Sequence, residues 1–89
     1  MVDGRRYEVA ECDFPVTESL QAAIQSFVDW LCDHADEIAA EEPGIMFELL
    51  CREQELEGDI RAARYAGGID GYAAAVLEGY YTHGGILES

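Results

Sequence analysis

The sequence predicts an all-α fold, in which residues 1–89 form a single compact three-helix domain. Three segments show the 3.6-residue apolar period of amphipathic helices: residues 17–40, 45–66 and 70–83. Pro43-Gly44 and Gly67-Gly68 separate these segments, and such pairs typically interrupt regular structure. A chain of 89 residues that is 49% hydrophobic has enough apolar side chains for one core.

The first predicted helix, over residues 17–40, is the longest of the three. Its apolar side chains recur mostly at steps of three and four residues: Leu20, Ile24, Phe27, Val28, Leu31, Ala35 and Ile38. Thr17 is a suitable N-cap, because its hydroxyl oxygen can accept a hydrogen bond from a free N–H group of the first turn. Glu18 follows it, where the helix dipole favours negative charge. We therefore expect one long helix with a buried stripe and a carboxylate-rich opposite side.

The second predicted helix, over residues 45–66, is apolar nearly all round in its first part, residues 45–51. A helical segment without a polar face is usually buried, so we expect this part to be central in the core. One seam continues across Gly58, although glycine costs up to about 1 kcal/mol relative to alanine inside a helix. It consists of Met46, Leu49, Glu53, Leu56, Ile60 and Ala63. The helix either passes through Gly58, with or without a kink, or stops there and restarts with Asp59 as its N-cap.

The third predicted helix, over residues 70–83, has Asp70 as its N-cap and Gly84 as its terminating residue. Its expected apolar face consists of Tyr72, Val76, Leu77 and Tyr80. Small residues recur every four positions along it: Gly71, Ala75 and Gly79. We interpret this ridge as a site of close packing within the molecule, with a contact between two copies as the alternative.

The segment before the first helix, residues 6–14, alternates loosely between apolar and polar side chains. This pattern fits a short N-terminal strand or an extended arm. A lone strand leaves its backbone hydrogen bonds unsatisfied, so it needs a partner. Ile86-Leu87 and a second copy of the chain are the two candidates.

The charge balance limits the classes of partner. Nineteen carboxylates face five arginines and no lysine, and the formal net charge is −14. Binding to nucleic-acid phosphates or to an anionic membrane requires clustered positive charge, so we expect neither. We expect a cytoplasmic protein, in the host-cell cytoplasm if it is phage-encoded, because we find no signal peptide and no apolar stretch of the roughly 18 residues that a membrane span needs. The charge favours a basic partner surface.

The residues that might carry chemistry do not form a recognisable catalytic or metal-binding pattern. The potential metal ligands are Cys12, Cys32, His34, Cys51 and His83. Cys32 and His34 point in nearly opposite directions from an intact helix, and zinc needs four converging ligands. We therefore expect no enzyme activity, no cofactor and no metal. The cysteines are interpreted as small buried apolar residues, and His34 as a histidine at the core edge that is hydrogen-bonded to Glu37 or to a carbonyl.

The carboxylates are concentrated in one part of the chain. Residues 29–59 contain eleven carboxylates and one cation, whereas residues 60–89 contain three carboxylates and two cations. The predicted partner-binding residues lie in the first part: Asp29, Asp33, Asp36, Glu37, Glu41 and Glu42. On one helix, carboxylates three or four residues apart are about 5–6 Å apart at Cβ, a scale comparable to the phosphate spacing of a nucleic-acid strand.

In size and charge, the chain resembles small acidic phage-type inhibitors, which include DNA-mimic anti-restriction and anti-CRISPR proteins. The resemblance implies a monomer or homodimer that blocks a nucleic-acid-binding effector without doing chemistry. We therefore predict a non-enzymatic inhibitor or DNA mimic that occupies a basic nucleic-acid-binding site on another protein. Two alternatives remain open. One is an accessory or antitoxin-like protein that docks or dimerises through apolar helix faces, and the other is an ordinary domain of a halophile.

Overall fold

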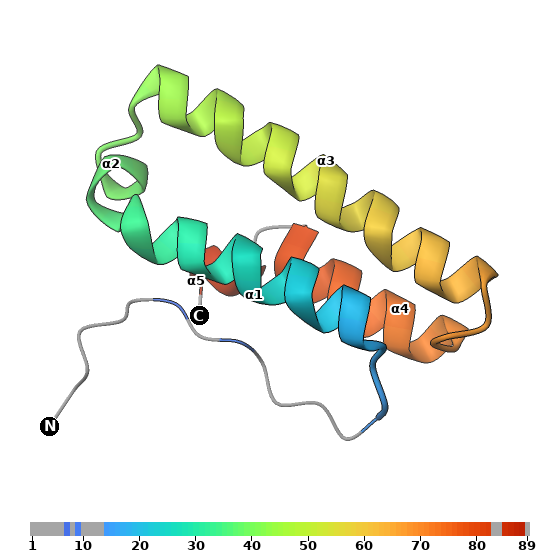
Figure 1. The fold of residues 1–89 in the computed structure, drawn as a ribbon. Coiled ribbons are helices and arrows are strands. Elements are labelled where there is room, and N and C mark those ends of the chain that lie inside the picture. Colours follow the sequence, from blue (N-terminus) through green and yellow to red (C-terminus); the bar gives the residue numbers. More distant parts are fainter. Residues whose placement is uncertain (1–6, 8, 10–13, 83–84, 89) are drawn as a thin grey trace, which may run out of the picture.

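The computed structural model describes residues 7, 9, 14–82 and 85–88, and it confirms the all-α fold. The helices are α1 (Glu18–Asp33), α2 (Ala35–Ala39), α3 (Pro43–Tyr65), α4 (Gly71–Leu77), a π-helical turn η1 (Glu78–Thr82) and α5 (Gly85–Glu88). Helices α1 and α3 lie side by side and antiparallel, α2 joins them at one end, and α4 and α5 lie behind them (Figure 1). The described residues include no strand.

Helix α1 begins and packs as the sequence predicts. The Thr17 hydroxyl oxygen accepts a hydrogen bond from the Leu20 N–H at 3.3 Å, which confirms Thr17 as the N-cap. The apolar stripe is buried, and Val28 and Leu31 at its centre have no exposed surface. Phe27 meets Tyr81 of η1 edge to face, with ring centroids 6.4 Å apart, and this contact joins α1 to the layer behind it.

The predicted helix over residues 17–40 is wrong in its last part, because α1 ends at Asp33 and α2 is a separate short helix. The break is at His34, whose backbone angles, φ −117° and ψ 21°, lie outside the helical region. The His34 ring stacks on the Trp30 ring at 4.7 Å between centroids, and its Nδ1 is 3.0 Å from the Trp30 carbonyl oxygen. The bend redirects the chain toward α3 and buries Ile38.

Helix α2 ends in a tight hydrogen-bonded turn that leads directly into α3. Glu41 adopts a positive φ of 55°. The Glu41 N–H donates to the Ile38 carbonyl at 3.0 Å, and the Glu42 N–H donates to the Glu37 carbonyl at 3.2 Å. This pair of bonds is the Schellman arrangement, in which glycine usually occupies the left-handed position. Pro43 then takes the first position of α3, where its missing N–H costs nothing.

Helix α3 is continuous from Pro43 to Tyr65, so it passes through Gly58 without stopping. Leu49, Leu56 and Ile60 are its buried residues, and all three belong to the predicted seam. The expectation that residues 45–51 are central is wrong for half of their apolar side chains: Leu49 is buried and Ile45 and Met46 pack against the core, but Phe47, Leu50 and Cys51 are exposed. Phe47 is 70% exposed and Leu50 is 51% exposed, because α1, α2 and the following helices cover only one side of α3.

Helix α4 begins at the predicted cap, since the Asp70 carboxylate accepts from the Ala73 N–H at 2.8 Å. The predicted apolar face is confirmed for Leu77, which is buried, and for Tyr80, which packs against the core, but it is wrong for Tyr72 and Val76, because the buried side is rotated by about one residue. Ala73, Ala74, Leu77 and Tyr81 are buried, whereas Tyr72 is 71% exposed and Val76 is 39% exposed. Ala73 and Ala74 are therefore core residues despite their small size.

The ridge of small residues on α4 does not serve the packing that the sequence suggested. Gly71, Ala75 and Gly79 are all exposed. Close approach occurs instead between η1 and α5, because a Cβ atom added to Gly85 would lie 2.8 Å from the Gly79 carbonyl oxygen. Gly84, the predicted terminating residue, lies outside the described residues.

Most of the predicted N-terminal strand or arm, residues 6–14, lies outside the described residues. Tyr7 and Val9 are described, and neither is in a strand. Tyr7 is 9% exposed, and its carbonyl oxygen accepts a hydrogen bond from the Cys32 thiol at 3.2 Å. Ile86, one of the suggested strand partners, is instead buried within the helical turn α5.

Candidate protein interaction site

The six predicted partner-binding residues lie on the C-terminal end of α1, on α2 and in the turn before α3. We call residues 29–42 the acidic corner; it is the end of the α1–α3 pair where α2 lies (Figure 1). Asp33, Asp36, Glu41 and Glu42 are exposed, and Asp29 and Glu37 are half-buried. The break at His34 changes the predicted arrangement. Asp29 and Asp33 lie on α1, Asp36 and Glu37 lie on α2, and Glu41 and Glu42 lie in the turn that follows. The carboxylates therefore follow a bend in the chain instead of one straight row.

Most of these carboxylates have no side-chain partner among the residues that the structure describes. Asp29 accepts a hydrogen bond from the Gln25 side-chain amide at 2.9 Å. Within the described part of the chain, the side chains of Asp33, Asp36, Glu37, Glu41 and Glu42 form no ion pair or side-chain hydrogen bond. Their charges therefore contribute no contact that holds the fold together, and they remain available to an external cation.

Arg52 is the only cation in residues 29–59, and it is already engaged. Its guanidinium group pairs with Glu48 at 2.9 Å and lies over the Trp30 ring, 4.9 Å from the centroid. Together, Arg52, Trp30 and His34 fasten α3 to the bend between α1 and α2. The hydrogen bond between His34 and the Trp30 carbonyl confirms the expected role of His34 at the core edge.

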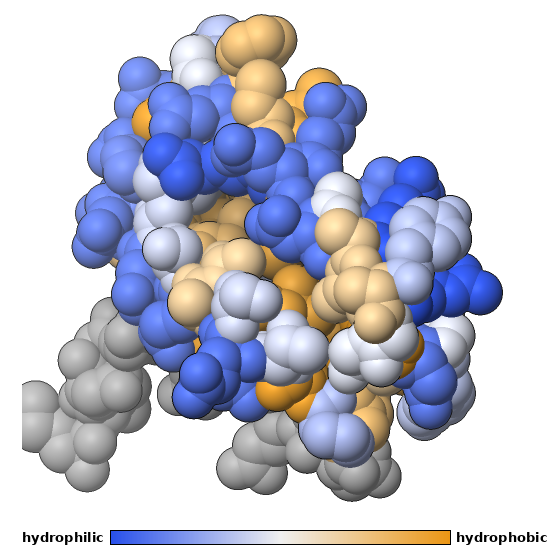
Figure 2. Space-filling view, turned by 45° about the vertical axis from the view of Figure 1, so that its right-hand side comes forward, coloured by the Kyte–Doolittle hydropathy of each residue, from blue (hydrophilic) through white to orange (hydrophobic). Residues whose placement is uncertain are grey.

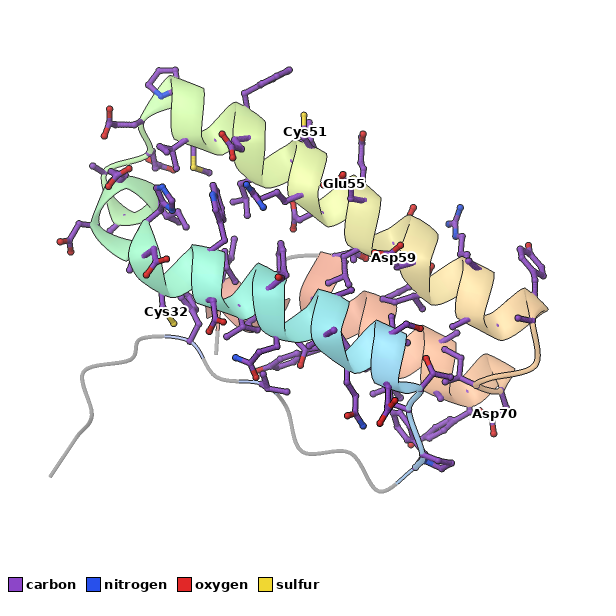
Figure 3. All side chains as sticks on the ribbon, in the orientation of Figure 1. Cys32, Cys51, Glu55, Asp59 and Asp70 are labelled. Carbon is purple, nitrogen blue, oxygen red and sulfur yellow. The ribbon has the colours of Figure 1, made fainter. Side chains whose placement is uncertain are left out.

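Two adjoining hollows, of about 230 and 470 Å³, lie between α1 and α3. We call them together the α1–α3 groove. Ala23 and Asp59 border both hollows, and Arg52 and Gly68 mark the two ends along the chain. Asp59 lies on the side of α3 that faces α1 (Figure 3). The sequence did not reveal this groove, because its existence depends on the separation of two helices.

The walls of the α1–α3 groove combine small side chains with carboxylates. The small residues are Ala23, Ala62, Ala63, Ala66 and Gly68. Glu55 and Asp59 are exposed on the α3 side, and neither forms an ion pair within the described residues. Figure 2 shows one face of the molecule, on which apolar side chains are exposed between hydrophilic ones. The groove is thus a shallow, mostly small-residue surface with a negative border.

The other arginines of α3 stabilise its C-terminal half. Arg61 donates a hydrogen bond to Glu78 of η1 at 3.1 Å and pairs with Glu57 at 3.4 Å. The hydrogen bond with Glu78, followed by the charge of Glu57, raises the pKa of Arg61 above its ordinary value. Arg61 therefore stays charged and links α3 to η1, and both carboxylates belong to the fold.

The cysteines have separate environments. Cys32 is half-buried beside Tyr7, whereas Cys51 is exposed, so the expectation that both are buried is wrong for Cys51. The two thiols lie on different helices and point away from each other (Figure 3). Among the described residues, no three histidine, cysteine, aspartate or glutamate side chains lie where they could hold a metal ion. Cys12 and His83 lie outside those residues.

No protein-family model, no curated protein and no solved structure matches the chain. Within the described part of the chain, no helix has both the length and the apolar character that crossing a membrane requires.

Proposed function

We propose that this protein is a non-enzymatic inhibitor or DNA mimic that binds a basic, nucleic-acid-binding site on a partner protein. The observation that carries this proposal is the set of acidic-corner carboxylates that form no ion pair with any described residue: Asp33, Asp36, Glu37, Glu41 and Glu42. Four of these five side chains are exposed, and they follow one another over a short length of chain. A surface groove lined with lysine and arginine is the complementary partner.

The stability of the fold alone does not favour these charges. Like charges on neighbouring turns repel one another, and Glu41 and Glu42 lie at the C-terminal end of α2, where the helix dipole disfavours carboxylates. Glu41 also occupies a left-handed backbone position that favours glycine. A residue that is unfavourable in three ways supports a role outside folding.

The bend at His34 gives the carboxylates of the acidic corner a curved arrangement. Asp29 and Asp33 form one pair along α1, and the remaining four carboxylates follow α2 and its turn. A nucleic-acid strand also curves while it presents phosphates at short intervals. The curved set therefore suits a concave basic groove, and steering by opposite charge would accelerate association.

The second candidate function is docking or dimerisation through apolar helix faces, as in an accessory or antitoxin-like protein. The exposed side of α4 favours it, since Tyr72 is 71% exposed and lies on the same helix as the exposed small residues Gly71 and Ala75. Adaptation to high salt is the third explanation, and it requires no partner. Folding only at high salt would support that explanation.

A capture experiment tests the proposal with variants of equal net charge. The immobilised protein is exposed to an extract of its source cells, and bound proteins are displaced by duplex DNA. The test variant carries Asp33→Asn, Asp36→Asn and Glu42→Gln. The control carries Ala22→Lys, Gln54→Lys and Ala75→Lys, all at exposed positions elsewhere. Each variant adds three positive units to −14 and so has a net charge of −11.

We expect the wild type and the control to retain a nucleic-acid-binding protein that DNA displaces. The test variant should bind it at least about tenfold more weakly, since three charges at roughly 0.5 kcal/mol each amount to about 1.5 kcal/mol. Equal retention by the two variants would contradict the proposal. Circular dichroism checks that both variants remain folded.

A further inference from the structure

The α1–α3 groove offers a second surface, separate from the acidic corner. It extends along α3 from Arg52 to the end of the helix at Tyr65, about 20 Å, and continues to Gly68 in the turn that follows. Leu20, Phe27 and Leu56 form its apolar base. Small residues along its walls permit a helix backbone to approach closely, because they lack the longer side chains that would hold it away.

We propose that the α1–α3 groove binds a positively charged amphipathic helix of a partner protein. The apolar face of that helix would rest on the small residues, and its lysines or arginines would pair with Glu55 and Asp59. A helix placed between α1 and α3 would add a further helix to the bundle. Binding of amphipathic helices in apolar grooves is a recurrent mode of peptide recognition.

Charge complementarity selects this occupant. Glu55 and Asp59 are four residues apart on α3, so their side chains lie on the same side of the helix. The arginine at one end, Arg52, pairs with Glu48 and lies over the Trp30 ring, and no described cation pairs with either carboxylate of the groove. A second copy of this chain would bring another net charge of −14 to the same surface, so it is disfavoured as the occupant.

The test uses a fluorescein-labelled 16-residue helical peptide, with leucine and alanine on one face and lysine on the other. A peptide of the same composition, scrambled to remove the apolar face, is the control. Binding is measured by fluorescence anisotropy at low salt. We expect the amphipathic peptide to bind with a Kd below about 100 μM and the scrambled peptide to bind at least about fivefold more weakly.

Two matched pairs of variants locate the binding surface. Ala62→Tyr places a bulky side chain in the groove, and Ala75→Tyr makes the same change on α4; both alanines are exposed. Glu55→Gln with Asp59→Asn removes two charges at the groove, and Asp33→Asn with Asp36→Asn removes two at the acidic corner. We expect each groove variant to weaken binding at least about fivefold, and each control to change it less than about twofold.

Several results would overturn this inference. They are equal binding of the scrambled peptide, no binding up to about 1 mM, and unchanged binding to Ala62→Tyr. Unchanged binding after loss of Glu55 and Asp59 would remove the assignment of a cationic occupant. The inference is independent of the proposed function, because the carboxylates of the groove and those of the acidic corner are replaced in separate variants.

Discussion

Replacement of Glu41 by glycine should stabilise the protein, although it removes a residue of the acidic corner. Glu41 has a φ of 55° in the turn that closes α2. Its N–H and that of Glu42 donate the two hydrogen bonds of the turn, and a glycine at position 41 would keep both backbone donors. The substitution therefore lowers the conformational free energy of the left-handed backbone and keeps the hydrogen bonds of the turn.

The magnitude follows from three contributions. A non-glycine residue in the left-handed region costs roughly 1–2 kcal/mol, which the substitution relieves. Removal of a carboxylate from the C-terminal end of α2 contributes about 0.3 kcal/mol, because so short a helix has a weak dipole. Glycine makes the unfolded chain more flexible, which opposes these gains by about 0.4–1 kcal/mol. The expected net stabilisation is about 1 kcal/mol.

Urea denaturation of the wild type, Glu41→Gly and Glu41→Ala separates these contributions. Alanine removes the charge but keeps the strained backbone, so we expect Glu41→Ala to raise the free energy of unfolding by only about 0.3 kcal/mol. In a thermal melt, Glu41→Gly should raise the melting temperature by about 4–8 °C, the shift typical of 1 kcal/mol in a domain of this size. If Glu41→Gly is no more stable than Glu41→Ala, then the argument from the positive φ is incorrect.

Substitutions at Gly85, Asp70, Leu49 and Phe47 test the packing and the cap of α4. Gly85→Ala should destabilise the protein by about 1–3 kcal/mol, because its Cβ would lie 2.8 Å from the Gly79 carbonyl oxygen; an unchanged denaturation midpoint would contradict this close approach. Asp70→Ala should lower the free energy of unfolding by about 1 kcal/mol, because the N-cap hydrogen bond is lost. Asp70→Asn should keep most of that stability, because its side-chain oxygen can still accept the bond. Leu49→Ala should lower the free energy of unfolding by about 2–5 kcal/mol, and Phe47→Ser should lower it by less than about 0.5 kcal/mol. Thermal melts measure both changes. A similar loss of stability for the two variants would mean that Phe47 is in the core.

The sequence predicts those parts of the fold that depend on local chemistry. Thr17, Pro43 and Asp70 occupy the expected cap and first-turn positions, because each acts on backbone groups within a few residues of itself. The buried stripe of α1 follows from its period alone. These features need no knowledge of which helices are neighbours.

The features that the sequence did not predict depend on contacts between distant residues. The break at His34 accompanies a stack on Trp30, whose ring is also covered by Arg52 from α3. The face of α4 was misassigned because Ala73 and Ala74 are core residues despite their small size. Their burial depends on how the helices around them pack, and helical periodicity contains no information on that arrangement.

The same distinction applies to the candidate surfaces. The acidic corner was predictable, since its members lie close together along the chain, although the bend between Asp33 and Asp36 was not. The α1–α3 groove combines residues 17–27 with residues 52–68 and appears only when the two helices are placed. Its discovery adds a surface that the charge pattern alone did not indicate.

The salt dependence of the complex with the captured partner tests the central claim most directly. Binding of the wild type and of the Asp33→Asn, Asp36→Asn, Glu42→Gln variant is measured from about 50 to 500 mM salt, over which screening becomes much stronger. We predict that the wild-type Kd rises steeply with salt and that the variant binds weakly with a shallower slope. A wild-type Kd that does not change with salt, or equal slopes for the two proteins, would contradict recognition through the acidic corner.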